Sequence, residues 1–186
     1  MTMYFIAIVL PQDLNAEIIT YKKMMLEKWG CKVGLKSPAH ITLIPPSWLP
    51  PEVEKEIISD LDHLAKHFSP FVIDTINFSS FKPRTIFIDV VLSNELNEVK
   101  KVVNNFFKQN TKYAVKTDNR PFHPHITIAT RDFSKSVFAE AWPYFQEKEF
   151  TKSFTASGIS LLRHNGAIWD IIHTAQFAKS NENCTS

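Results

Sequence analysis

Glycine and cysteine are both scarce in this chain of 186 residues, which has four glycines and two cysteines. So few glycines leave no Gly-rich loop of the kind that holds nucleotide phosphates, and a P-loop hydrolase therefore finds no support. Cys31 and Cys184 cannot make a disulfide framework, and neither has a catalytic base nearby in the sequence, which argues against cysteine proteolysis. This use of cysteine favours a reducing, cytoplasmic location.

Long hydrophobic runs and a large net charge are missing as well. The apolar run at residues 3–10 is too short to cross a bilayer, has no basic flank, and ends in Pro11-Gln12-Asp13 rather than in a cleavage site. We therefore expect neither a membrane span nor export. The net charge of +2 is far from the basic balance of proteins that coat long nucleic acids. We expect no DNA partner, whereas a small phosphorylated ligand or one RNA end fits.

Hydrophobic periodicity predicts a regular alternation of strands and helices. The first half of the chain gives a strand at 4–10, a helix over 14–25, a short strand at 40–44 that ends at Pro45-Pro46, a helix over 53–68 and a strand at 71–81. The second half gives a strand at 85–92, a helix over 96–106, a strand at 125–130, a helix over 138–145, and strands near 150–163 and 167–177 that an Asn165-Gly166 turn links.

The two halves repeat the same order of elements. A strand-helix-strand-helix-strand unit runs from residue 4 to 81, and the same order runs again from 85 to 177. The opening strands also agree, "YFIAIVL" against "IFIDVVL". The chain therefore looks like an internal duplication whose copies pack around an approximate two-fold axis. We expect one domain over residues 1–178 and a polar tail at 179–186, and the internal two-fold favours a monomer.

Each half contains one His-x-Thr motif at an equivalent place. Residues two apart in a strand point to the same face, so His40 shares a face with Thr42, and His125 shares one with Thr127. The apolar residues between them would face the core. One such motif is typical of a structural histidine. Two at equivalent points of a repeat favour a function, because repeats usually preserve core positions and these are polar.

Two histidines that face one ligand fit acid-base chemistry on a phosphodiester. A neutral imidazole removes a proton from the attacking water or hydroxyl, and a protonated imidazole supplies a proton to the leaving oxygen. The threonine hydroxyls can donate hydrogen bonds to non-bridging phosphate oxygens. No metal or other cofactor is required, because an imidazole with a pKa of about 6.5 serves in either state near neutrality. Pseudo-symmetry leaves open which histidine is the base.

The paired motifs, His40-Ile41-Thr42-Leu43 and His125-Ile126-Thr127-Ile128, resemble those of the two-histidine (2H) phosphoesterase superfamily, in particular its 2'-5' RNA ligase-like bacterial members. The resemblance covers residues 4 to about 177. It implies a bilobal α+β fold, in which two pseudo-symmetric units with mainly antiparallel sheets surround a central cleft. It also implies metal-independent hydrolysis of 2',3'-cyclic phosphates, on an RNA 3' end or a small nucleotide, usually to the 2'-phosphate. The two histidines would be the acid-base pair, and the two threonines would bind the phosphate.

Six further residues are candidates for substrate binding. Many members of the superfamily carry Arg or Lys three residues after the second threonine; here Thr130 holds that place and Arg131 follows it. The loop before the second motif holds a basic residue beside aromatic ones, which suits a nucleotide, although packing is the commoner use of such rings. The candidates are Arg131, Arg120, Phe122, His123, Lys36 and Trp48.

Three alternatives use the same motifs. A non-catalytic module would hold a phosphorylated ligand or an RNA end without turning it over. A 2'-5' RNA ligase would use a 5'-hydroxyl in place of water, although water in large excess favours hydrolysis. A metal-dependent hydrolase would use the histidines as ligands, but two imidazoles and two alcohols make a poor metal site. His63 and His67 have the i, i+4 spacing of metal ligands but lack a companion glutamate, so a solvated helix face is the simpler interpretation.

Overall fold

The computed structural model describes residues 1–116, 120–132 and 134–178; Cys184 and the predicted tail at 179–186 lie outside these ranges. The elements, in chain order, are β1 (Thr2–Val9), α1 (Gln12–Trp29), the 3-10 helix η1 (Val33–Lys36), β2 (His40–Leu49), the 3-10 helix η2 (Pro51–Val53), α2 (Glu54–Ala65), β3 (Phe71–Phe81), β4 (Thr85–Val90), α3 (Asn94–Gln109), β5 (His125–Thr130), α4 (Lys135–Gln146), β6 (Ser153–Ala156), β7 (Gly158–His164) and β8 (Trp169–Gln176). Within the described ranges, no helix is both long and apolar enough to cross a bilayer.

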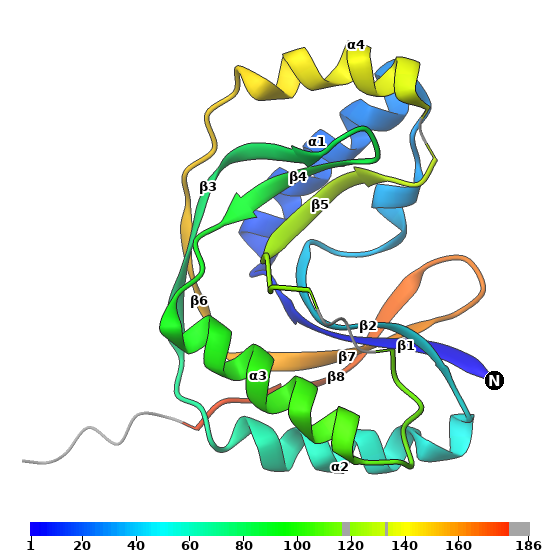
Figure 1. Cartoon of the computed structure of the whole chain (residues 1–186), viewed down its shortest axis with the longest axis vertical. Helices are drawn as coiled ribbons and strands as arrows, with labels where there is room; N and C mark the ends of the chain where they lie inside the picture. Colours follow the sequence, from blue (N-terminus) through cyan, green and yellow to red (C-terminus); the bar gives the residue numbers. More distant parts are fainter. Residues whose placement is uncertain (117–119, 133, 179–186) are drawn as a thin grey trace, which may run out of the picture.

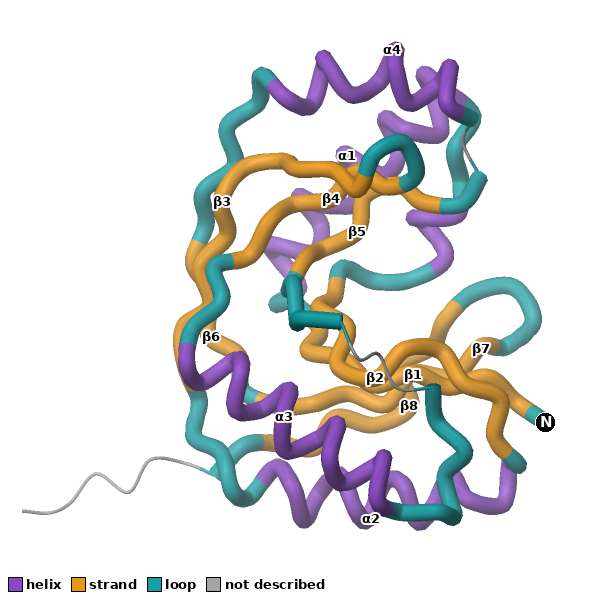
Figure 2. The backbone as a smooth tube through the Cα atoms, viewed as in Figure 1, coloured by secondary structure: helices purple, strands orange, loops and turns teal. Residues whose placement is uncertain are grey.

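The strands form one antiparallel sheet in the order β6-β3-β4-β5-β2-β1-β7-β8. Helices α1 and α4 lie against the half made of β3, β4 and β5, whereas α2 and α3 lie against the half made of β1, β2, β7 and β8 (Figure 1). Figure 2 shows in the same view that the strands of the two halves come together at β5 and β2. The predicted α+β class with a mainly antiparallel sheet is confirmed.

Each half of the sheet contains strands from both predicted repeats and packs against one helix from each repeat. Strand β3, which closes the first repeat, pairs with β4 of the second, and β7 pairs with β1 of the first. Helix α1 likewise packs on β5, and α3 packs on β2. Neither half of the sheet is therefore made from one repeat alone. The repeat boundaries at 4–81 and 85–177 stay a prediction.

The second strand is longer than the sequence predicts. We expected it to end at Pro45-Pro46, but β2 continues to Leu49. Between the pairs Ile6–Ile44 and Tyr4–Ser47, β1 advances two residues while β2 advances three, so the prolines occupy an irregularity in the ladder. Proline is tolerated at such a bulge because a residue there need not donate to the neighbouring strand.

The predicted strand near 150–163 is two strands. β6 pairs with β3 at one edge of the sheet, and β7 pairs with β1 in the other half, so the chain crosses between halves at Ser157. Gly158 follows at once and lies close to β8, where an added Cβ would sit 2.6 Å from the carbonyl oxygen of Ala175. The predicted hairpin after β7 is confirmed, with Gly166 at a φ of 103°.

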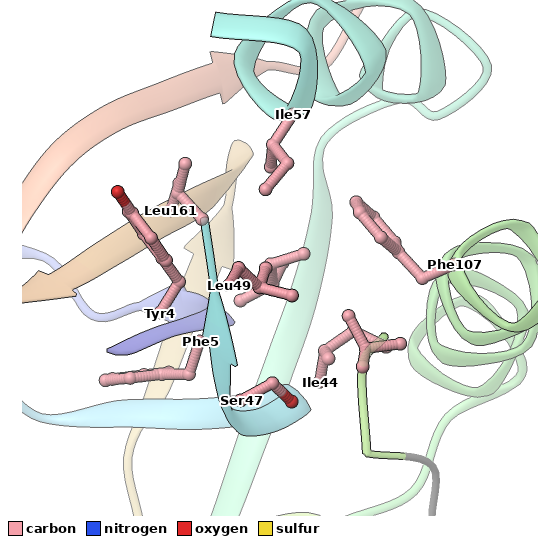
Figure 3. Close-up of a pocket in the computed structure, with 10 residues that line it drawn as sticks. Tyr4, Phe5, Ile44, Ser47, Leu49, Ile57, Phe107 and Leu161 are labelled. Atoms are coloured by element: carbon pink, nitrogen blue, oxygen red, sulfur yellow. The ribbon is translucent and has the colours of Figure 1, made fainter. Parts of the chain in front are cut away.

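A small gap remains in the core between β2 and the helices α2 and α3. Figure 3 shows Ile57, from α2, and Phe107, from α3, pointing toward Leu49 and Ile44 of β2. The cavity has a volume of about 10 Å³. That is about the space of one water molecule, and the side chains around it are almost all apolar. We therefore regard it as a packing gap and not as a ligand site.

An aromatic cluster fills the other half of the core. Phe145, from α4, is fully buried, and its ring centroid lies 5.1 Å from that of Phe78 in β3 and 6.4 Å from that of Tyr21 in α1. The ring of Phe145 therefore packs against both α1 and the sheet, and holds α4 in place.

Replacing that ring should leave a cavity. We expect Phe145→Ala to lower the free energy of unfolding by about 3–5 kcal/mol, as large-to-small changes of buried aromatic residues do. Chemical denaturation followed by circular dichroism measures the change. Val72→Ala on β3, where the side chain is 57% exposed, is the control and should change stability by less than about 1 kcal/mol. Equal losses in both variants would contradict this account of the core.

Candidate active site

The two His-x-Thr motifs meet at the junction between the halves of the sheet. Strands β2 and β5 run antiparallel and are paired at Ile41 and Ile126, the residue between histidine and threonine in each motif. Both isoleucines are fully buried in the main core. Because side chains alternate along a strand, the histidines and threonines point to the opposite face. We call this the histidine face.

The register of this pair also decides which residues lie across from one another. In an antiparallel pair, the neighbours of two opposed residues are opposed in reverse order. His40 is therefore opposite Thr127, and His125 is opposite Thr42. All four side chains are partly exposed. The arrangement gives each histidine the threonine of the other motif as its neighbour across the strands.

Each imidazole is held by a hydrogen bond of the same kind, from Nδ1 to a backbone carbonyl oxygen. The Nδ1 atom of His40 lies 2.8 Å from the carbonyl oxygen of Pro38, and Nδ1 of His125 lies 2.8 Å from the carbonyl oxygen of His123. A carbonyl oxygen can only accept, so Nδ1 carries the hydrogen in both rings. In the neutral form the lone pair is then on Nε2. Each histidine is thus prepared to accept or donate a proton at the same atom.

Each imidazole also packs against a phenylalanine on the neighbouring strand. The ring centroids of His40 and Phe5 lie 4.7 Å apart, and those of His125 and Phe87 lie 5.0 Å apart. Phe5 and Phe87 hold the same place in "YFIAIVL" and "IFIDVVL", the two opening strands. With one side of the ring against phenylalanine and Nδ1 bonded, little rotation is left to either imidazole. Phe81 adds an edge contact to His125, at 5.1 Å.

The charges around the two histidines differ. Burial, followed by the positive charges of Lys22 and His125, lowers the pKa of His40 to about 4, although its bond to the Pro38 carbonyl acts in the opposite direction. His40 is therefore neutral at pH 7.

Burial also lowers the pKa of His125, and the neighbouring charge of His123 adds to the effect. Here the carboxylate of Asp89 opposes the shift, as does the bond to the His123 carbonyl. Asp89 lies opposite His125 in the β4–β5 register and accepts a hydrogen bond from His123 Nε2 at 2.9 Å. The second histidine is thus the easier of the two to protonate.

The site also contains the two threonine hydroxyls. Within the described ranges, neither Thr42 nor Thr127 spends its hydroxyl on another residue, so both can donate to a ligand. Over the same ranges, no group of three or more histidine, cysteine, aspartate or glutamate side chains could hold a metal ion. The site therefore offers two imidazoles and two hydroxyls on one face.

This pairing of motifs has a counterpart among known sequences. The sequence model of the 2'-5' RNA ligase superfamily matches residues 10–167, which include both motifs. The chain belongs to this superfamily. The predicted resemblance is confirmed, and with it membership of a group of phosphoesterases and ligases. A search of curated protein sequences found no match.

Solved structures from two bacteria share this fold. TT0787 of Thermus thermophilus has a TM-score of 0.69 at 18% identity, over 97% of this chain and 100% of that chain. E. coli LigT in complex with 3'-AMP has a TM-score of 0.62 at 18% identity, over 95% and 98% of the two chains. E. coli LigT in complex with ATP has a TM-score of 0.60 at 18% identity, over the same shares. At this identity the likeness establishes the fold.

Three of the six substrate-binding candidates lie near the second motif of this superfamily member. His123 is exposed, and its ring centroid is 6.3 Å from that of His125. Phe122 is partly buried against the core, with Lys100 Nζ 5.4 Å from its ring centroid. Arg120 is exposed, immediately after residues 117–119, which lie outside the described ranges. Contact of these three with a substrate stays a prediction.

The other three candidates lie at or near the ends of β5, β2 and η1. Arg131 follows the last residue of β5, roughly 20 Å along the strand from His125. It adopts a φ of 69° and lines an open pocket of about 500 Å³ with Arg84 and Lys135. Trp48 is 55% exposed near the end of β2, where it pairs with Met3 of β1. Lys36 is exposed at the end of η1. Contact of these three with a substrate also stays a prediction.

The sequence analysis missed two kinds of residue that lie around the histidines. Phe5 and Phe87 could have been found, because they recur at one place in the repeated strands. Lys22 and Asp89 could not be found from the motifs, because they come from α1 and β4, far from them in sequence. Both act on the histidines through charge.

The pKa values can be measured directly. In an NMR titration of the histidine rings, we expect His40 to stay neutral until the pH falls to about 4, because its imidazolium is poorly solvated and faces other positive charge. His125 should titrate above His40 and below about 6.5. His40→Ala and His125→Ala assign the two signals. A midpoint of 6.5 or higher for His40 would contradict this description.

Proposed function

We propose that the protein is a metal-independent phosphodiesterase that opens 2',3'-cyclic phosphates to the 2'-phosphate. The observation that carries this proposal is the Ile41–Ile126 pair, which puts two equally held imidazoles and two hydroxyls on one face. Membership of the 2'-5' RNA ligase superfamily supports it.

One reaction step accounts for the two histidines. Water attacks phosphorus and gives a proton to the Nε2 lone pair of one neutral imidazole. The bond from phosphorus to the 3'-oxygen breaks, and this oxygen takes a proton from the protonated second imidazole. The products are a 2'-phosphate and a 3'-hydroxyl. Thr42 and Thr127 donate hydrogen bonds to the non-bridging oxygens, where negative charge builds up in the transition state.

The substrate is an RNA 3' end or a small cyclic nucleotide. Support comes from E. coli LigT, whose structures contain 3'-AMP, ATP and NADP+. We propose that residues 1–178 form the catalytic domain and that it acts as a monomer in the cytoplasm. The free thiol of Cys31 is in keeping with a reducing compartment.

Ligation is the second candidate, because the superfamily is described by that reaction. A 5'-hydroxyl would replace water as the nucleophile and leave a 2'-5' linkage. The same two histidines would serve, with the same proton transfers. Hydrolysis is favoured because water is present in far higher concentration than any RNA end.

A short RNA that ends in a 2',3'-cyclic phosphate, incubated with the protein in excess chelator, tests the proposal. We expect wild type to give a single 2'-monophosphate. His40→Ala and His125→Ala should each lower the rate by about 10²–10⁴, because each removes one proton transfer. Product analysis by chromatography and mass spectrometry measures both results. An added RNA with a 5'-hydroxyl reports ligation in the same assay.

A histidine outside the site provides the control. His67→Ala, in the exposed turn that follows α2, should retain the wild-type rate. Full activity of either active-site variant would contradict the assignment. RNA that is bound by wild type, released by both variants and never cleaved would identify a binding module instead.

The pH dependence should have two limbs. His40 must be neutral to accept, and His125 must be protonated to donate, so kcat/KM should fall below about pH 4 and again above the pKa of His125. Since the pKa of His125 is lowered from 6.5, we expect the optimum between about 4 and 6.5. Steady-state kinetics on a small cyclic nucleotide measures it. An optimum above pH 7 would rule out this distribution of protons.

A further inference from the structure

A lysine is buried beneath the first motif. Lys22, in the middle of α1, is 2% exposed, and its Nζ donates to the carbonyl oxygen of Ser37 at 3.0 Å. Within the described ranges it has no carboxylate partner. An ammonium group without a counter-charge is costly to bury, so an apolar side chain would be the more stable occupant of this place.

The backbone around Lys22 leads directly to His40. Ser37 precedes Pro38, and the carbonyl of Pro38 accepts the Nδ1 hydrogen of His40. The lysine therefore holds one end of the short segment whose other end orients the imidazole. Two hydrogen bonds, from Lys22 to Ser37 and from His40 to Pro38, fix this segment from both sides.

The 3-10 helix η1 covers the Lys22 side chain and keeps water away from it. An added Cβ at Gly34 would sit 2.1 Å from the carbonyl oxygen of Ile128 and 3.7 Å from Cγ of Lys22. Only a glycine lets η1 approach β5 so closely above the lysine side chain. With water kept out, the charge of Lys22 is weakly screened and acts over a longer distance.

The nearby charges are distributed unequally between the motifs. His40 faces the positive charges of Lys22, from α1, and of His125, from β5. His125 faces His123 and the carboxylate of Asp89, from β4. Burial lowers the pKa of Lys22 to about 8, so the ammonium form still dominates at pH 7. Positive charge therefore lies behind the first histidine and negative charge beside the second.

We propose that Lys22 is a positioning residue: it fixes the segment that orients His40 and, through its charge, adds to the burial that keeps this imidazole neutral, so that His40 is the proton acceptor of the reaction and His125 the donor. This inference rests on the proposed function for the direction of proton transfer. The effect of Lys22 on His40 does not depend on it.

Two substitutions separate the charge of Lys22 from its hydrogen bond. Lys22→Met removes both, and Lys22→Gln removes the charge while keeping an N–H donor. If the charge keeps His40 neutral, both variants should raise the NMR titration midpoint of His40 by on the order of one pH unit. The acid limb of kcat/KM on a small cyclic nucleotide should move upward by the same amount. Lys23→Met, one residue further along α1 and exposed, should change neither.

Each other result overturns the proposal. An unchanged His40 midpoint in both variants would leave Lys22 a purely structural residue. A shift in Lys22→Met alone would assign the effect to the hydrogen bond and not to the charge. If Lys22→Met fails to fold, Lys22→Gln decides the question. The NMR measurement needs no turnover, so failure of the proposed phosphodiesterase activity would be seen separately from failure of this inference.

Discussion

The backbone pair between Ile41 and Ile126 is the contact on which the site depends. It joins β2 to β5 and thereby the two halves of the sheet. If one of these strands shifted by one residue, its His-x-Thr motif would turn toward the core while the other motif kept its place, because side chains alternate along a strand. The cost of exposing a buried isoleucine and burying an imidazole prevents such a shift. The same apolar residues that fill the core therefore place the histidines on one face.

The structure combines a symmetric scaffold with asymmetric charge. The bond from Nδ1 to a carbonyl and the packed phenylalanine recur at both histidines, as a duplicated chain would provide. A pair of identical imidazoles would have no reason to differ in protonation. Lys22 behind one histidine and Asp89 beside the other remove this equivalence. The repeat thus explains the geometry, and its divergence explains how two like residues can have opposite roles.

Much of this arrangement follows from the sequence, because strand periodicity alone fixes that His and Thr share a face. The order of strands and α-helices from β1 to α4 and both motif strands were predicted, and β5 has the predicted bounds. The sequence could not reveal that β3 and β7 exchange halves, since pairing partners far apart leave no local pattern. The bulge that carries β2 past Pro45-Pro46 also depends on its partner strand. Lys22 illustrates a different limit: it lies four residues after Ile18 and so falls on the apolar side of α1, yet Tyr21 fits the helical spacing equally well. Only the close approach of η1, which a glycine permits, closes the site around the lysine.

The same asymmetry also explains how the site would return to its starting state. In the proposed reaction, one turnover would leave a proton on His40 and remove one from His125, which is the reverse of the resting arrangement. The charge of Lys22 makes a protonated His40 unfavourable, so its proton is released to water readily. Asp89 favours the uptake of a proton by His125. Because both charges are fixed in the fold, the pair would recover its resting state after each turnover, and the proposed direction of proton transfer would be kept.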